Sequence, residues 1–432
     1  MEYVIYGLGA VVFFVLVMAS IALHEIGHLV PGKIFDVRTT QYFVGFGRTV
    51  WSRFRGETEY GFKAIPLGGY VRFVGMYPPA KDNPGQVRSA RTGIFQSLAD
   101  NARAAEWETV RTEDGGRLFY QKKVWQKLII MAGGPTMNLL LAFVIIFGVT
   151  ATYGVHRTQL TVNRVQECIV AVGEPTDDCA GKPKTPAYAS GIQPGDTIVA
   201  FNGQPVSDWD EMSLLIRANL DQIAQITVLR NGQTVQLTPV NTVITGVADR
   251  WDPGKRVAAG FFGVEPVVQR ERGGPIVVLD DMWTMAQQTG HALLAFPAKV
   301  YYTAANLITG KPRDIYGPMS IVGASRAAGE VASTDQINAS DKVATMFMLL
   351  GSVNLFVALF NFIPLLPLDG GHIVGALYEG LKKLLARLRG RPDPGYVDTA
   401  KMLPVAYAVG GIILISGIVL ILADLIDPIT LF

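Results

Sequence analysis

Four apolar runs set the strongest limit on how this 432-residue chain can fold. Each run is long enough for a membrane-spanning helix, which needs about 20 apolar residues to cross a bilayer. Composition agrees, because 49% of the residues are hydrophobic and 17% are charged, against about 25% charged in a typical soluble domain. The sequence therefore predicts a polytopic α-helical membrane protein with four transmembrane helices, at residues 1–32, 128–155, 343–371 and 403–425.

Charge in the connecting segments predicts the orientation. Residues 33–128 carry 16 Lys/Arg against 9 Asp/Glu, and residues 367–402 carry 6 against 4, whereas residues 154–343 carry 16 against 19. Basic loops stay in the cytoplasm, so we expect both termini to be extracytoplasmic in a multi-pass inner or plasma membrane protein. The sequence has no Lys/Arg-rich block of the kind that binds nucleic acid, so we expect no nucleic-acid partner. The expected environment is the lipid bilayer.

The remaining segments divide into smaller regions. Cys168 and Cys179, the only cysteines, fall in the predicted outside part, where a disulfide can persist; their spacing leaves open whether they pair. We expect a β-rich region that is cytoplasmic or re-enters the membrane at 33–127, an extracytoplasmic β-rich domain at 159–267, an amphipathic helical region at 268–342, a cytoplasmic linker at 372–402 and a tail at 426–432.

The first apolar run contains a metal-binding motif, HEIGH at residues 24–28. His24 and His28 lie four residues apart, so on a helix both project from one face and can share a zinc ion. Glu25 lies between them and has the residue type and the position of the general base in this motif. The alternative is a pair of histidines that simply hydrogen-bond neighbouring helices.

Asp369 is the candidate third ligand. The first and third apolar runs both cross from outside to inside, and His24 and Asp369 each lie near the inner end of their run, so the three side chains can meet at one depth. Two histidines and one carboxylate leave a fourth zinc position for water, as catalytic sites require. Ionisable groups inside a membrane are costly and mark function. The motif therefore predicts zinc-dependent hydrolysis within the membrane.

Several motifs in order along the chain resemble the site-2 protease family of intramembrane zinc metalloproteases. They are HEIGH, "GFKAIPLGGYVRFVGM" at 61–76, "AGGPTMN" at 132–138, "YASGIQPGDTIVAFNG" at 188–203 and "NFIPLLPLDGG" at 361–371. The resemblance is nearest to the bacterial branch with a single PDZ domain, in an actinobacterial-like subgroup. It implies one Zn²⁺ per chain, bound by His24, His28 and Asp369, with Glu25 as the catalytic base.

The resemblance also implies substrate-binding residues. Asn361, Pro364 and Asn138 match family positions near the site, although Asn361 could equally cap a broken helix and Asn138 could join two helices. The segment with Gly68 and Gly69 corresponds to a membrane-reentrant β-sheet that takes an extended substrate by strand addition. Without the family, an ordinary cytoplasmic hairpin is the simpler interpretation.

The family implies a place in regulated intramembrane proteolysis. Substrates would be single-pass membrane proteins, typically anti-sigma factors, already shortened by an upstream site-1-type protease, with remnant signal peptides as a second class. The domain at 159–267 resembles PDZ domains and would gate or filter substrates. Two other functions fit parts of the pattern: a divalent-metal transporter lined by intramembrane His and Asp, and a non-catalytic scaffold that uses the PDZ-like domain.

Overall fold

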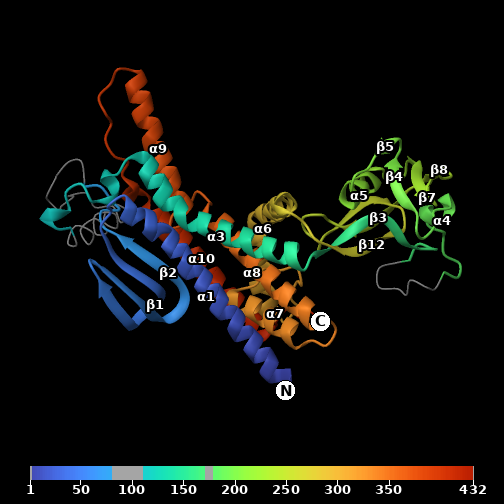
Figure 1. The fold of residues 1–432 in the computed structure, drawn as a ribbon, viewed down its shortest axis with the longest axis horizontal. Helices are drawn as coiled ribbons and strands as arrows, with labels where there is room; N and C mark the ends of the chain where they lie inside the picture. The colour runs from blue at the N-terminus through green and yellow to red at the C-terminus, as the bar shows by residue number, and fades with distance from the viewer. Residues whose placement is uncertain (1, 80–109, 171–178, 432) are drawn as a thin grey trace. The chain divides into compact units, whose positions relative to one another are not determined.

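The computed structural model describes residues 2–79, 110–170 and 179–431. The chain divides into two compact units. The first, called here the helical unit, contains residues 1–148 and 275–432; the second, the β unit, contains residues 149–274. Figure 1 labels the main elements of both.

Four helices are long and apolar enough to cross a membrane, which confirms the four predicted spans. They coincide with the predicted runs, except that the third ends ten residues before residue 371. The hydrocarbon core of a bilayer offers no hydrogen-bond partner to backbone N–H and C=O groups. Helices satisfy these groups internally, so they are the expected form of such segments. Their bounds are α1 (Glu2–Ile34), α3 (Val124–Thr152), α8 (Ala339–Asn361) and α10 (Leu403–Ile426).

The break after α8 lies where the sequence has two prolines. Proline lacks an N–H and clashes with the preceding helical turn, so Pro364 and Pro367 end the helix. Residues 362–368 form consecutive turns, with a hydrogen bond from Leu368 N to Leu365 O of 2.9 Å. A new helix, α9 (Asp369–Leu388), begins at the candidate ligand. It occupies much of the segment that the sequence interpretation treated as a linker.

Among the described residues of this unit, three short 3₁₀ helices and two further α-helices accompany these elements. Both α-helices lie within the region 268–342. The bounds are α6 (Pro275–Thr309), α7 (Ile321–Ser333), η1 (Thr112–Asp114), η2 (Phe119–Gln121) and η3 (Thr399–Met402).

The β region of the helical unit contains two long strands, β1 (Thr39–Arg55) and β2 (Thr58–Phe73), that fold back on themselves. Residues 39–44 pair on one side with 69–73 and on the other with 59–62, and residues 58–63 also pair with 49–55. Two strands therefore form four rows, in the order 69–73, 39–44, 58–63, 49–55. The bends fall at Gly45, Gly47 and Gly68, whose positive φ angles suit glycine.

Ion pairs tie the base of this sheet to the segment before α3. Arg38 and Asp114 form a buried pair. Arg117 donates to the Glu57 carboxylate at 2.8 Å, and Lys33 donates to it at 3.1 Å. Burial opposes the charge of Glu57, but these two cations hold its pKa below the usual value. The predicted region 33–127 thus has a fixed base, while residues 80–109 of it lie outside the described part.

The short helix α7 joins one end of α1 to one end of α10. A Cβ on Gly9 of α1 would lie 2.6 Å from the Ala332 Cβ. Asp424 of α10 accepts hydrogen bonds from the backbone N–H of Ser320 (2.7 Å) and Gly323 (3.1 Å) at the start of α7. The first turns of α1 and the last turns of α10 therefore lie on the same side of the helical unit (Figure 1).

The β unit is a small antiparallel domain with its own core. Its main sheet has the order β12-β3-β4-β7-β8, with β5 beside β4, and two small two-stranded sheets, β10-β11 and β6-β9, accompany it. Helix α5 begins at Trp209, after the N-cap residue Asp208. The elements are β3 (Val155–Val165), α4 (Pro186–Ser190), β4 (Thr197–Phe201), β5 (Gln204–Pro205), α5 (Trp209–Ala218), β6 (Ile223–Ala224), β7 (Ile226–Arg230), β8 (Gln233–Gln236), β9 (Val240–Asn241), β10 (Val243–Ala248), β11 (Arg256–Phe261) and β12 (Val264–Glu271).

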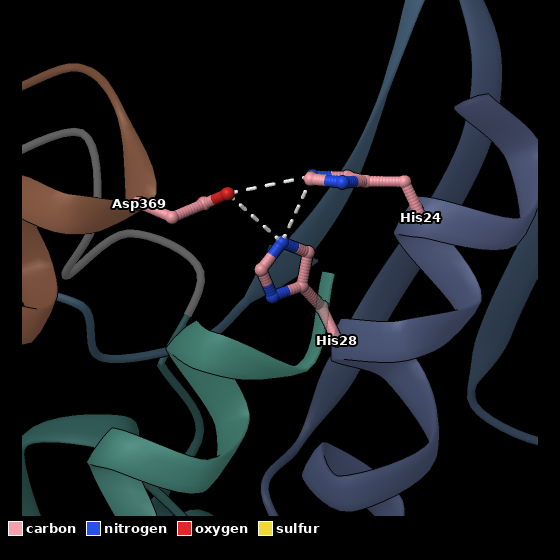
Figure 2. A group of neighbouring side chains, drawn as sticks. All are labelled: His24, His28 and Asp369. Atoms are coloured by element: carbon pink, nitrogen blue, oxygen red, sulfur yellow. Dashed lines mark hydrogen bonds and ion pairs between the residues drawn. The ribbon is translucent and has the colours of Figure 1, made fainter. Parts of the chain in front are cut away.

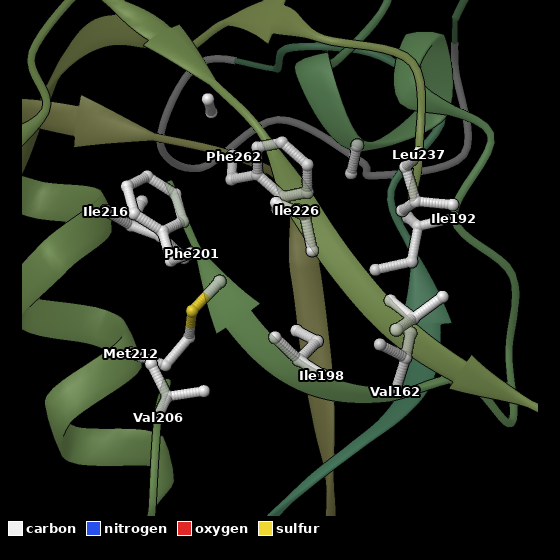
Figure 3. Close-up of a cluster of buried hydrophobic side chains, with 13 residues drawn as sticks. Val162, Ile192, Ile198, Phe201, Val206, Met212, Ile216, Ile226, Leu237 and Phe262 are labelled. Carbon is white, nitrogen blue, oxygen red and sulfur yellow. The ribbon is translucent and has the colours of Figure 1, made fainter. Parts of the chain in front are cut away.

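Thirteen buried side chains, shown in Figure 3, fill the space between the main sheet and α5. Cys168 and Cys179 form a disulfide in this unit, with Cα atoms 5.6 Å apart, which answers the question that the sequence left open. The core comprises Val162, Ala187, Ile192, Ile198, Phe201, Val206, Met212, Ile216, Ala224, Ile226, Val228, Leu237 and Phe262.

Candidate metal centre

Three side chains from two distant parts of the sequence converge in the helical unit. Figure 2 shows His24 and His28 projecting from α1 toward Asp369 at the start of α9. His24 Nε2 and His28 Nε2 lie 3.3 Å apart, and Asp369 Oδ2 lies 3.4 Å from each. Both imidazoles are buried. The three candidate ligand atoms thus form a nearly equilateral triangle.

The size of this triangle fits zinc. With zinc–ligand bonds of about 2.0–2.1 Å and tetrahedral angles, neighbouring ligand atoms lie about 3.3–3.4 Å apart. Asp369 Oδ2 is buried and has no hydrogen-bond partner among the described residues. Buried polar atoms normally have such a partner, so this oxygen atom is an exception. Three ligands at this spacing leave one tetrahedral position for water or substrate.

The backbone of α3 fixes the orientation of one histidine. His28 Nδ1 lies 2.8 Å from the carbonyl oxygen of Ile130. A carbonyl oxygen only accepts, so Nδ1 carries the hydrogen and Nε2 keeps its lone pair for a metal. This contact selects the tautomer that a zinc ligand needs.

Glycines bring α1 and α3 into backbone contact at the same level. A Cβ on Gly27 would lie 2.3 Å from Gly133 O, so neither helix can carry a side chain there. A Cβ on Gly134 would lie 2.2 Å from His28 Nε2 and 2.7 Å from His24 Nε2. Gly134 therefore leaves free the space in front of the two nitrogen atoms.

Glu25 lies against the nearest row of the folded sheet. It is buried, and its carboxylate accepts a hydrogen bond from the backbone N–H of Val71. A Cβ on Gly69 would lie 2.9 Å from Glu25 Cγ, so glycine permits this approach. The Tyr42 hydroxyl also donates to Ala22 O of α1 at 2.9 Å. Sheet and motif helix are thus in direct contact.

The remaining predicted site residues differ in their burial and in their hydrogen-bond partners. Asn138 of α3 is buried one helical turn beyond Gly134, and its Oδ1 has no partner among the described residues. Asn361 ends α8 and donates to Val357 O of its own helix at 3.1 Å, which fits the capping alternative. Pro364 is exposed in the turn after α8, and Gly68 forms the bend at φ +132°.

Sequence reasoning did not single out the contacts that hold the centre in place. Gly133 and Gly134 belong to the quoted AGGPTMN segment, but a glycine pair gives no sign of which helix it meets. Ile130 acts through its carbonyl, so its side chain carries no signal at all. His372, three residues after Asp369, does not belong to the triangle.

Comparison with known proteins adds an independent line. The sequence matches peptidase family M50 over residues 12–392. It is 31% identical to the zinc metalloprotease Rip1 of Mycobacterium tuberculosis over 446 residues, which covers 98% of each chain. Identity to Rip1 of Mycolicibacterium smegmatis is 30% with 99% coverage of each, and to the metalloprotease MmpA of Caulobacter vibrioides 26% with 84% coverage of each.

Proposed function

Because the chain belongs to peptidase family M50, the site-2 protease family of zinc metalloproteases, we propose that His24, His28 and Asp369 bind its zinc ion and that Glu25 is the catalytic base. The triangle of 3.3–3.4 Å between the three ligand atoms is the observation that carries this assignment. The chain is thus a zinc metalloprotease, and the proposal concerns which residues perform the reaction.

The chemistry follows from the residues around the triangle. Bound zinc supplies a Lewis acid that polarises a peptide carbonyl and makes a water molecule more acidic. Glu25 accepts the proton of the attacking water and returns it to the departing amide nitrogen, as a general base and then acid. Ile130 keeps His28 in the required tautomer, and Gly134 keeps the reacting side open. The Asn138 amide, one helical turn beyond Gly134, is a candidate to hydrogen-bond the substrate, because its buried Oδ1 has no partner among the described residues.

The substrate backbone would add to the sheet row formed by residues 69–73. A helix inside the membrane hides its peptide groups, so cleavage requires an unwound segment whose freed N–H and C=O groups find new partners. Among the described residues, no strand pairs with the far edge of this row. Gly68 and Gly69 form the bend and the close approach to Glu25, so an added strand would run beside the base. Asn361 and Pro364 would line the other side, before Asp369.

The substrates are membrane proteins, and we propose the narrower class of single-pass proteins already cleaved outside by a site-1-type protease. Anti-sigma factors are the leading members of this class, with remnant signal peptides as another. The β unit would act as a PDZ-like gate on such substrates. In its main sheet, β12 pairs only with β3 among the described strands, so one edge can receive an extended peptide.

We further propose that the β unit and both termini face the outside of the inner membrane, with the zinc site near the cytoplasmic side. The basic loops support this orientation. The disulfide between Cys168 and Cys179 supports it independently, because disulfides persist in oxidising compartments.

The test compares wild type with Glu25→Gln in detergent, using a tagged single-pass substrate that lacks its outer domain and measuring bound zinc in parallel. Glutamine keeps the size of the side chain but cannot take a proton. We expect zinc to remain in both proteins and cleavage to fall by about 100- to 10,000-fold in the variant. Asp369→Asn serves as the ligand variant and should lose zinc as well.

Two results would contradict the assignment. Undiminished cleavage by Glu25→Gln would mean that another residue acts as the base. Full zinc retention in a His24→Ala and Asp369→Ala double variant would place the metal elsewhere. The metal-transport alternative would replace this proposal if wild type holds zinc, cuts no truncated membrane helix and moves Zn²⁺ into liposomes. The metalloprotease relatives favour neither metal transport nor a non-catalytic scaffold.

A further inference from the structure

Helix α9 exposes an apolar face and packs its other face against the protein, which is the reverse of the arrangement expected for a helix exposed to water. Its apolar side chains recur at intervals of three and four residues, which places them on one stripe. Ala376 is buried and Ile373 packs against the core cluster that contains Phe73 and Ile130, but seven larger apolar side chains are exposed, between 39% and 72% of their possible surface. We call this set the α9 stripe: Val374, Leu377, Tyr378, Leu381, Leu384, Leu385 and Leu388.

The opposite face of α9 packs against the protein through both apolar and polar groups. Glu379 is buried, and its carboxylate accepts hydrogen bonds from Lys127 of α3 at 2.8 Å and from Lys383 at 2.7 Å. The backbone N–H of Val397 approaches the same carboxylate at 3.3 Å. A Cβ on Gly380 would lie 3.1 Å from Val124. The helix is therefore held to α3 by its polar side, and the stripe points away.

The surroundings of the stripe indicate a lipid surface. Its anchor is the first turns of α3, a helix apolar enough to span the membrane, so the stripe starts at the membrane boundary. Residues 380–392 carry five Lys/Arg and no Asp/Glu. At about 100° per residue, Lys382 and Arg387 flank the stripe on its two sides, and Arg389 and Arg391 follow it. An apolar stripe edged by basic residues suits an interface with anionic headgroups.

We propose that α9 docks on the anionic surface of the bilayer through this stripe and its flanking basic residues, and that docking holds Asp369 in ligand position. Lipid docking stands on the surface of α9 alone. Its consequence for the metal rests on the proposed function, in which Asp369 binds zinc.

The coupling follows from geometry, because Asp369 is the first residue of α9. Glu379, the anchoring residue, lies ten residues further, or about 15 Å along the helix axis. A tilt of about 10° about Glu379 would move Asp369 by about 2.6 Å, whereas metal–ligand distances are held within about 0.2 Å. The stripe on the outer face of α9 is exposed in the described structure. In this proposal the bilayer supports that face, so loss of docking should loosen the third ligand.

Single-cysteine labelling tests the docking directly. Both native cysteines are in a disulfide, so Leu384→Cys and Leu388→Cys can each carry one fluorophore in the full chain. Ala386→Cys, on the other side of the same turns, is the matched control. The labelled proteins are placed in nanodiscs of phosphatidylcholine, with or without phosphatidylglycerol and with brominated acyl chains as quenchers.

We expect brominated lipid to quench the labels at 384 and 388 several-fold more than the label at 386, and more strongly with phosphatidylglycerol. Equal access of aqueous iodide to all three positions would overturn the proposal. So would shielding that rises with protein concentration and ignores brominated lipid, because a second copy of the chain would then cover the stripe.

A zinc measurement tests the coupling. Changing Lys382, Arg387 and Arg389 together to Gln should weaken lipid docking by about 100-fold and speed zinc loss to a chelator in phosphatidylglycerol nanodiscs. The same neutralisation at Arg250, Lys255 and Arg256 of the β unit is the control and should change neither. Lipid-independent zinc loss in wild type would refute the coupling. Neither readout needs proteolysis, so an inactive wild type would count against the proposed function only.

Discussion

The β unit and the helical unit use burial in opposite ways. The β unit buries a core cluster of thirteen apolar side chains and exposes most of its charged side chains, as is typical of a domain in water. The helical unit buries His24, Glu25, His28 and Asn138, while leucines and isoleucines of α1 and α10 are exposed. The difference teaches that burial has no single meaning. In the β unit it marks mainly hydrophobic stabilisation, whereas the helical unit buries the proposed site residues beside its apolar clusters, where ionisable groups are costly.

The largest expected effect is at a glycine of the helical unit. Gly134→Ala puts a Cβ within 2.2 Å of His28 Nε2, so the imidazoles must move out of the triangle. Zinc affinity and cleavage should each fall by at least about 100-fold, while the protein stays folded. Gly148→Ala, in the same helix where a Cβ meets nothing, is the control for zinc content and should behave as wild type.

A matched pair of isoleucines tests the comparison itself. Ile198 is fully buried in the β unit, whereas Ile415 is 63% exposed on α10. Ile198→Ala should destabilise the β unit by about 2–5 kcal/mol, and Ile415→Ala should cost at most about 0.5 kcal/mol. Hydrogen exchange at the β4 and β7 amides, with zinc content measured alongside, checks both. Equal costs at the two positions would break the contrast.

A buried charge in the β unit predicts its response to acid. Arg230 donates two hydrogen bonds of 2.7 Å to the Asp196 carboxylate. Burial opposes the charge, but Arg230 and the backbone N–H of Gln193 hold the pKa of Asp196 below its usual value. A lowered pKa stabilises the fold at neutral pH, and this contribution of roughly 1–3 kcal/mol disappears as the pH falls below about 5.

The measurement is the pH dependence of β-unit exchange in wild type and Arg230→Gln. Arg230→Gln should be less stable than wild type at neutral pH. It should also lose less stability on acidification, because its ionised Asp196 carboxylate stabilises the fold less at neutral pH. A variant with the same acid sensitivity as wild type would assign the effect to other groups.

The smallest expected effect is at a polar contact between membrane helices. Asn354 Nδ2 of α8 donates to Ser20 Oγ of α1 at 3.1 Å, one turn before His24. Interhelical hydrogen bonds in bilayers contribute about 0.6 kcal/mol, so Asn354→Leu should barely change thermal stability, with Ser20→Ala giving a similar value. A loss of several kcal/mol in either variant would show that this membrane contact stabilises as strongly as the β-unit core.

Sequence patterns predicted the parts of the fold that hydropathy and residue type determine. The four apolar runs became four helices, and Pro364 and Pro367 explain where α8 ends. Helix α9 was missed because its leucines face outward next to basic residues, a composition that favours a loop when a packed core is assumed. The fold-back of β1 and β2 was also out of reach, since each residue of 41–44 pairs on both sides and the register depends on bends rather than on alternation.

The candidate site divides in the same way. His24, His28 and Asp369 follow from a motif and a depth argument, and the structure brings all three together. The roles of Glu25, Asn138, Asn361 and the two sheet glycines stay predictions. The contacts of Ile130 and Gly134 could not be foreseen, because a backbone carbonyl and a missing side chain leave no mark in residue type.

The shared contacts of α1 and α10 with α7 have a practical consequence for imaging in cells. Complementary fragments of a split fluorescent protein, fused to the two ends of one chain, would meet on the same side of the membrane and could reconstitute without a second molecule. In the proposed topology the segment between α9 and α10 would lie on the other side, so a fragment inserted there would stay dark with either end. Such a reporter would read out sidedness in living cells.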